Sequence, residues 1–183
     1  MKHFRRTLLI SLSLIAATFA LAEEKPRVSP HETITASIDG SDVTIVYGRP
    51  YTKDPKTGTP RKIWGELVPF GKVWRTGADE ATLLTTKQAF DIGGTVVPAG
   101  TYSLFTLPDE NGGAKLIINT QTGQWGTKYD EKQDLARIEM KKETLEKPVD
   151  QFTMAIEKNP AGGGTLKMSW DKMQYSVALK AKK

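Results

Sequence analysis

Short segments in which apolar and polar residues alternate recur along most of this chain, and glycine and proline separate them. Residues 33–38 and 42–47 alternate on either side of Asp39-Gly40, a pattern that predicts a β-hairpin. A second hairpin is expected around Gly93-Gly94. Further strand-like segments lie at 81–86, 101–107, 116–119, 152–156, 166–170 and 175–179. The segment 134–140 fits a short helix as well as a strand.

These segments are about ten residues apart, and none of them predicts a long helix. The pattern therefore predicts an all-β fold, an antiparallel β-sandwich or barrel-like structure with about nine to ten strands and little helix. A length of 183 residues suits a single domain. The chain has no cysteine, which excludes disulfides, thiolate zinc sites and a catalytic thiol.

The first 22 residues have the pattern of a secretory signal peptide. Lys2, Arg5 and Arg6 precede an apolar run at 8–20, and Ala20-Leu21-Ala22 is typical of a cleavage site. The run is shorter than the ~20 residues that a membrane-spanning helix needs, and no later stretch is long and apolar enough to span. An uncleaved anchor is the alternative. We expect an exported protein, periplasmic or extracellular.

The rest of the chain divides simply. We expect a flexible lead-in at 23–30, a single β-rich domain at 31–179 and a basic tail at 180–183. The formal net charge of +5 includes three cations of the leader, so its removal leaves 23 basic and 21 acidic residues, a net charge of +2. No sustained basic face is visible, and a nucleic-acid partner is not expected. The oligomeric state is left open.

Motifs for catalysis are few. His31 is the single histidine after the leader, which excludes a zinc site made of several histidines within one chain. No nucleophile elbow and no phosphate-binding glycine motif in a strand-to-helix setting is present, so no cofactor and no metal are predicted. Whether His31 binds a metal together with distant carboxylates is left open, and so is an acid–base role.

Aromatic and charged residues gather at predicted strand ends and in loops. Trp74 is interpreted as a core residue or a recognition platform, and Arg75 as a partner of Asp79 or Glu80 or as an anion-binding group. Trp125 is either a lid on the core or an exposed platform. The long loop 48–62 is either functional or mobile. The candidate ligand-binding residues are His31, Tyr47, Arg49, Trp74, Arg75, Thr76, Asp79, Glu80, Trp125 and Tyr129.

Several strings of residues resemble the DUF2911 family, bacterial secreted domains of unknown function. They are Ser29-Pro30-His31, Tyr47-Gly48-Arg49-Pro50, 67–71, 73–82, 98–105, and Gln124-Trp125-Gly126 with Tyr129 and Asp130 after it. The resemblance covers about residues 29 to 179 and implies a secreted β-rich domain, with no established activity. Two departures stand out, because family members commonly have Asn at position 79 and a shorter loop at 53–60.

Three functions are compatible with these patterns. The first is a binding domain of the cell envelope for a small polar or anionic ligand such as a glycan, in which residues 31, 47, 49, 74, 75 and 80 converge on one cleft. The second is a hydrolase that uses His31 with Glu80 or Asp79 as acid–base groups. The third is a structural or interaction protein of the envelope, for which a flat apolar patch is expected instead of a cleft.

Overall fold

The structure is a computed structural model that describes residues 27–182, so the predicted signal peptide lies outside the described residues. Nine strands form one antiparallel sheet, and the all-β prediction is confirmed. The strands are β1 His31–Ile38, β2 Ser41–Gly48, β3 Thr82–Thr86, β4 Phe90–Ile92, β5 Thr95–Val97, β6 Gly100–Pro108, β7 Ala114–Asn119, β8 Asp134–Lys158 and β9 Gly164–Ala181. The one helical element among the described residues is the short 3-10 helix η1, Glu131–Gln133.

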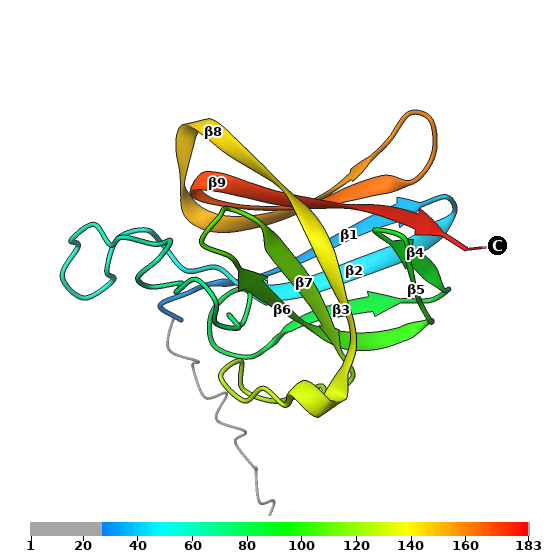
Figure 1. Cartoon of the computed structure of the whole chain (residues 1–183), viewed down its shortest axis with the longest axis horizontal. Coiled ribbons are helices and arrows are strands. Elements are labelled where there is room, and N and C mark those ends of the chain that lie inside the picture. The colour runs from blue at the N-terminus through cyan, green and yellow to red at the C-terminus, as the bar shows by residue number, and fades with distance from the viewer. Residues whose placement is uncertain (1–26, 183) are drawn as a thin grey trace, which may run out of the picture.

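The sheet has the strand order β1-β2-β3-β6-β7-β8-β9-β4-β5 and folds over on itself (Figure 1). The long strand β8 causes this fold: its first seven residues, 134–140, pair with β7, whereas 141–158 pair with β9. Two register irregularities, between Thr144 and Val149 and between Val149 and Thr153, interrupt the β8–β9 ladder. Such irregularities bend a strand and increase its twist, which lets β8 and β9 turn back across the first half of the sheet.

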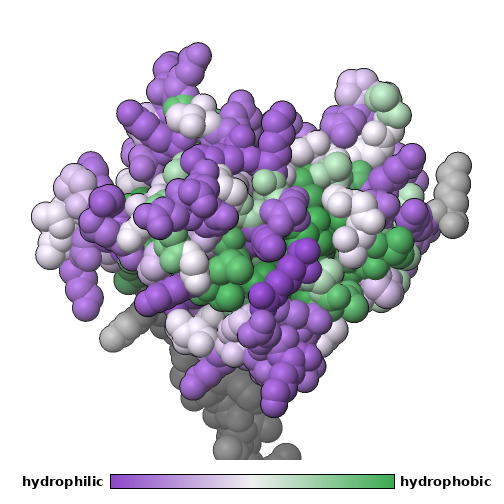
Figure 2. All heavy atoms as spheres, in the orientation of Figure 1, coloured by the Kyte–Doolittle hydropathy of each residue, from purple (hydrophilic) through white to green (hydrophobic). Residues whose placement is uncertain are grey.

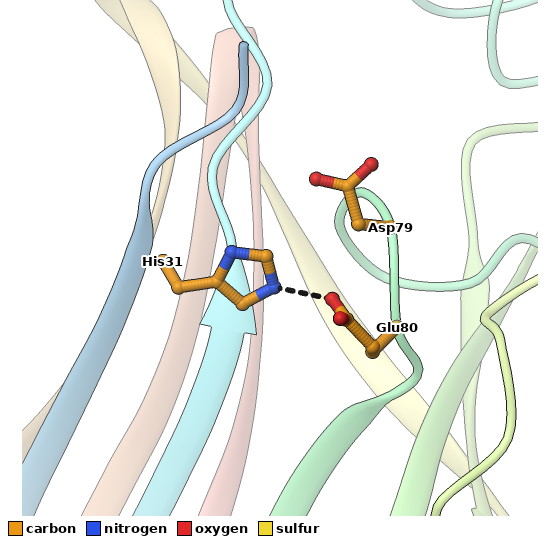
Figure 3. A group of neighbouring side chains, drawn as sticks. All are labelled: His31, Asp79 and Glu80. Atoms are coloured by element: carbon orange, nitrogen blue, oxygen red, sulfur yellow. Dashed lines mark ion pairs between the residues drawn. The ribbon is translucent and has the colours of Figure 1, made fainter. Parts of the chain in front are cut away.

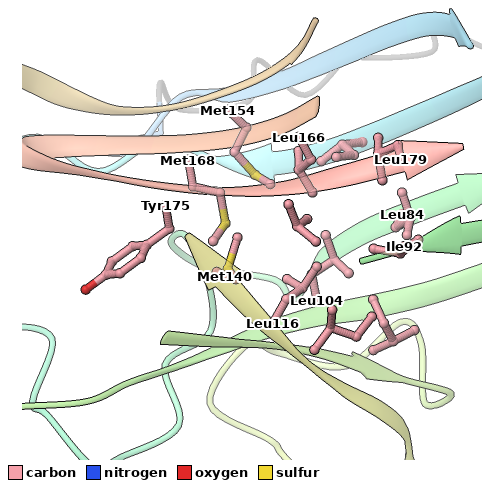
Figure 4. Close-up of a cluster of buried hydrophobic side chains, with 14 of the residues drawn as sticks. Leu84, Ile92, Leu104, Leu116, Met140, Met154, Leu166, Met168, Tyr175 and Leu179 are labelled. Carbon is pink, nitrogen blue, oxygen red and sulfur yellow. The ribbon is translucent and has the colours of Figure 1, made fainter. Parts of the chain in front are cut away.

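The core fills the space between the two halves of the sheet. Leu84, Leu104 and Leu116 come from one half, and Met154 and Leu166 face them from the other (Figure 4). Strict alternation explains this placement, since in β2 each of the apolar residues Val43, Ile45 and Tyr47 is buried. The core therefore rests on the same period-two pattern that predicts the strands.

Both predicted hairpins are present, and their turn residues explain them. Asp39 and Gly40 have φ of 51° and 85°, and Gly93 and Gly94 have φ of 56° and 89°. Two consecutive residues in this left-handed region are what a two-residue hairpin turn needs to match the twist of its strands. The turns join β1 to β2, with Ile38 paired to Ser41, and β4 to β5, with Ile92 paired to Thr95.

An aromatic cluster closes one end of the core. The rings of Trp74 and Trp170 are stacked, with centroids 5.7 Å apart and an angle of 19° between their planes. Phe152 packs edge-on against Trp74 at 5.0 Å, and Trp64 packs against Tyr175 at 5.4 Å. Trp74 precedes β3 while Phe152 and Trp170 belong to β8 and β9, so this cluster joins the two halves of the sheet.

Two regions are defined more closely by the structure than by the sequence pattern. The ambiguous segment 134–140 is a strand, the first part of β8. β9 continues to Ala181 and pairs Lys180 with Asp91, so the strand extends into the stretch predicted as a basic tail.

Figure 2 shows hydrophilic residues over most of one face, with a band of hydrophobic residues across its middle. No described helix is both long and apolar enough to cross a membrane.

Candidate functional site

A cavity of about 560 Å³ lies beside the aromatic cluster, a volume within the range of small-molecule sites. Its walls come from chain segments that are far apart in the sequence: the segment before β1, the loop after β2, the segment before β3, β6, the loop after β7, and β9. The lining includes Tyr51, Arg61, Trp74, Arg75, Asp79, Phe105, Tyr129 and Trp170. We call this cavity the pocket.

The segment Trp74–Glu80 forms one wall of the pocket and is held by close backbone contacts. The N–H of Ala78 donates to Gly48 O at 3.2 Å, and the N–H of Gly126 donates to Asp79 O at 2.8 Å. A Cβ at Gly48 would lie 2.3 Å from Ala78 O, and one at Gly126 would lie 2.8 Å from Arg75 Cδ. Only glycine fits at these two positions, so three separate sequence motifs meet here through their backbones.

Thr76 fixes this wall from beneath. Its side chain is buried, and its hydroxyl lies 2.7 Å from Thr106 Oγ1. Its carbonyl accepts a 2.7 Å hydrogen bond from the Thr82 hydroxyl. Thr76 and Asp79 both have left-handed backbones, with φ of 52° and 63°. Residues other than glycine take this conformation only where surrounding contacts hold them, so the segment is locally strained and firmly positioned.

The pocket carries two cations and one anion among its described lining residues, namely Arg61, Arg75 and Asp79. Arg75 makes no ion pair within the described part of the chain, and its Nε–H donates to Gly77 O at 3.3 Å. Arg61 donates to Tyr51 O through Nη2. Two N–H groups of lining residues, Arg61 Nε and Trp170 Nε1, are buried and have no acceptor within residues 27–182. Two guanidinium groups, one of which contains an unmet donor, and the unmet indole N–H of Trp170 favour an acceptor-rich, anionic ligand.

A second group of polar side chains lies at the rim of the pocket (Figure 3). His31 Nε2, at the start of β1, is 2.9 Å from Glu80 Oε2, and Asp79 lies beside both. Arg27 Nη1 contacts both Glu80 oxygens, at 2.9 and 2.6 Å, and lies 3.4 Å from His31 Nε2. The hydrogen bond from Arg27 is the main cause that lowers the pKa of Glu80 to about 2. Glu80 is therefore a carboxylate at any physiological pH.

Tyr47 and Arg49 point elsewhere, towards β8. The Tyr47 hydroxyl donates to Glu32 Oε2 at 2.6 Å and accepts from the N–H of Met154 at 2.9 Å. Burial, and then the bond to Glu32, raises the pKa of Tyr47 to about 12. Arg49 donates to Phe152 O at 3.1 Å and to Thr153 Oγ1 at 2.9 Å. These side chains tie β1 and β2 to β8, and neither lines the pocket.

The loop after β7 supplies Trp125 and Tyr129. The Tyr129 ring lines the pocket and packs 4.8 Å from Phe105, while its hydroxyl donates to Asp134 Oδ2 at 2.6 Å. Burial, and then this bond, raises the pKa of Tyr129 to about 12. Trp125 is 48% exposed and is not a lining residue, although its backbone bridges to Glu80. An exposed ring with its backbone anchored matches the platform interpretation more closely than the lid.

The ten predicted site residues therefore fall into separate places. Trp74, Arg75, Asp79 and Tyr129 line the pocket, and His31 and Glu80 lie at its rim with Asp79. Thr76 supports the wall, and the expected single cleft does not include Tyr47 or Arg49.

The lining residues that sequence reasoning did not single out include Tyr51, Arg61 and Trp170. The alternation in β9 does place Trp170 on an inner face, but alternation alone does not distinguish a cavity wall from the filled core. Tyr51 and Arg61 both lie within the long loop 48–62. The length of this loop was the one available signal.

Comparison with known proteins yields a family and nothing finer. A family model described as "Protein of unknown function (DUF2911)" matches residues 29–179. Neither a curated protein nor a solved structure matches the chain. The family match covers the lining residues of the pocket from Ser29 to Trp170, whereas Val28, which also lines the pocket, and Arg27 at the rim lie just before the matched range.

Proposed function

The chain belongs to the DUF2911 family, and from the geometry of its site we propose that it binds a small anionic ligand, such as an acidic sugar, in the pocket. One observation carries this proposal: the residues that line one cavity of about 560 Å³ include Arg61 and Arg75, and Arg61 Nε and Trp170 Nε1 are N–H donors without an acceptor within residues 27–182. A buried donor without an acceptor costs about 1–3 kcal/mol, and a ligand oxygen that reached it would recover this cost.

The charges at the pocket support an anion over a cation. Arg75 has no carboxylate partner within the described chain. Arg61 donates a hydrogen bond from one of its nitrogens to the carbonyl oxygen of Tyr51. Guanidinium groups bind carboxylates and phosphates through paired hydrogen bonds. Trp74 and Tyr51 add aromatic surface, which is suited to the apolar face of a sugar ring.

The cellular setting is a further part of the proposal. The positively charged, apolar and small-residue pattern of residues 1–22 supports export, with cleavage after Ala22. Mass spectrometry of the protein isolated from its native cells tests this. A chain that begins at Glu23 is the expected result, and a chain that retains its leader would contradict cleavage.

Thermal unfolding in the presence of small ligands tests the binding proposal. The panel contains phosphate, sulfate, di- and tricarboxylates, uronic acids and the matching neutral sugars. A ligand at about 100 times its dissociation constant stabilises the folded state by ~2.7 kcal/mol. We expect stabilisation by an anion, its loss in Arg75→Ala, and its retention in Lys87→Ala, which removes a cation outside the pocket. Equal responses of the two variants would contradict the proposed site.

A hydrolase is the second candidate, because His31 lies 2.9 Å from Glu80. With Glu80 ionised above pH of about 2, the carboxylate would orient the imidazole, and His31 would be the acid–base group. Hydrolysis of chromogenic esters and glycosides by the wild type and by His31→Ala tests this. Activity that survives unchanged in His31→Ala would exclude the mechanism.

A further inference from the structure

The rim cluster of His31, Asp79 and Glu80 joins one imidazole to two carboxylates. One nitrogen or oxygen atom from each side chain lies within 4.8 Å of the others. The three residues come from two chain segments, the first residue of β1 and the end of the strained segment before β3. We propose that this cluster binds a divalent transition-metal ion, Zn²⁺ in the first instance, in exchange with the guanidinium of Arg27.

The donor set indicates the class of ion. A histidine nitrogen and two carboxylate oxygens are all ligand types that zinc accepts, and three protein ligands would leave a fourth position open, as in catalytic zinc sites. Mg²⁺ and Ca²⁺ prefer sites made of oxygen ligands alone, so the nitrogen favours zinc over both. The nitrogen thus separates this cluster from an ordinary group of surface carboxylates.

A cationic group already occupies the cluster. Arg27 Nη1 lies 2.6 and 2.9 Å from the two Glu80 oxygens and 3.4 Å from His31 Nε2. One nitrogen of the guanidinium thus stands close to two of the three proposed ligand groups. A metal ion and this nitrogen cannot both hold that position, so Arg27 is a built-in competitor for the site.

Asp79 is available to a metal ion. Its carboxylate makes no hydrogen bond or ion pair within residues 27–182. Its backbone is fixed by the 2.8 Å bond from the Gly126 N–H and by the left-handed φ of 63°, so the carboxylate is presented in one place. The carboxylates of Asp79 and Glu80 lie close together and repel each other. A cation bound between them would remove that repulsion.

Small side-chain movements complete the geometry. Ligand atoms around a tetrahedral zinc ion at ~2.0–2.1 Å lie about 3.4 Å apart, so the widest separation in the cluster has to close by about 1.4 Å. The side chains of His31 and Glu80 are 25% and 44% exposed, which leaves them room to rotate. Asp79 also lines the pocket, so the ion would add positive charge at the pocket rim.

Isothermal titration of the purified, chelator-treated protein with ZnCl₂ tests the proposal. We expect one ion per chain, with affinity reduced at least tenfold in both His31→Ala and Asp79→Asn, because loss of a ligand costs at least as much as the ~10–100-fold that loss of an outer-shell partner costs. Arg27→Ala should bind Zn²⁺ more tightly than the wild type, because it removes the competitor. Asp42→Asn, which removes a carboxylate paired with Lys87 elsewhere on the surface, is the matched control.

The opposite changes in affinity keep the test decisive. Absence of Zn²⁺ binding in Arg27→Ala would overturn the site, and equal affinities of Arg27→Ala and the wild type would overturn the exchange. Affinity in His31→Ala and Asp79→Asn equal to that of Asp42→Asn would also overturn the site. Circular dichroism and thermal unfolding of each variant show that it is folded. Anion binding is measured separately in metal-free protein, so failure of the pocket proposal and failure of this one are distinguishable.

Discussion

Gly48 shows at the scale of a single residue how closely two backbones approach behind the site. A Cβ at this position would lie 2.3 Å from the carbonyl oxygen of Ala78, which cannot move without shifting the pocket wall. We expect Gly48→Ala to lower the free energy of unfolding by about 1–3 kcal/mol, the range typical of overpacking. Urea denaturation measures this change. Gly113→Ala is the control, since its new Cβ meets nothing within 4 Å, and similar losses in the two variants would refute the steric explanation.

Glu80 leads to a prediction about how the free energy of unfolding changes at low pH. Its pKa falls from 4.5 to about 2 because Arg27 hydrogen-bonds the ionised form. The unfolded chain therefore takes up this proton first, and the stability that Glu80 contributes above pH 4.5 is lost as the pH falls towards 2. Glu80→Gln should flatten the fall in unfolding free energy across this window, and added salt should weaken the effect, because the pair is exposed.

Urea unfolding at several pH values measures the slope for the wild type and the variant. Glu110→Gln, which removes an exposed carboxylate in the turn after β6, is the matched control. A Glu80→Gln slope equal to that of the wild type would show that the Arg27 contact does not act on stability.

Tyr47 acts at the scale of elements, because it joins β2 to β8. Its hydroxyl accepts from the buried N–H of Met154, and Tyr47→Phe leaves that N–H without an acceptor. We expect a loss of about 1–3 kcal/mol in unfolding free energy. The control is Tyr175→Phe, because within residues 27–182 the hydroxyl of the buried Tyr175 has only the sulfur of Met173, at 3.6 Å, as a hydrogen-bond partner. A Tyr47→Phe variant as stable as Tyr175→Phe would contradict the bracing role.

The elements differ in how far they follow from sequence. The hairpins at Asp39-Gly40 and Gly93-Gly94 are local, since two adjacent residues with positive φ determine each turn. The 25-residue strand β8 does not follow from local sequence. It changes partner from β7 to β9 and contains register irregularities that the alternation of apolar and polar residues does not reveal. Pairing of β4 with β9 joins residues about ninety positions apart, and only the completed core selects it.

The whole molecule should unfold as one unit. β8 pairs with both halves of the sheet, and a single core cluster contains residues of both. Opening either half exposes the apolar surface of the other, so partly unfolded states are costly. We expect tryptophan fluorescence and far-ultraviolet circular dichroism to report the same urea midpoint. Two separate midpoints would show that the halves are independent.

The candidate site is a property of the whole molecule, which limits its prediction from sequence. Arg75, Asp79 and Glu80 stand close together in the chain, and their shared role near the pocket follows from that proximity. Trp170 reaches the pocket only because β9 crosses the first half of the sheet. Arg61 reaches it from the long loop, whose path no local pattern determines.

The glycine contacts at positions 48 and 126 have a consequence for how such a protein can diversify. They place the pocket wall by backbone alone, so the identity of the groups that meet a ligand is separable from the scaffold that holds them. Substitution of Arg61 or Arg75, or a change in the sequence of the 53–60 loop, would then change which ligand the pocket selects while the fold stays intact. Under the proposed function, ligand recognition would depend on side chains, whereas the placement of the pocket wall depends on backbone contacts.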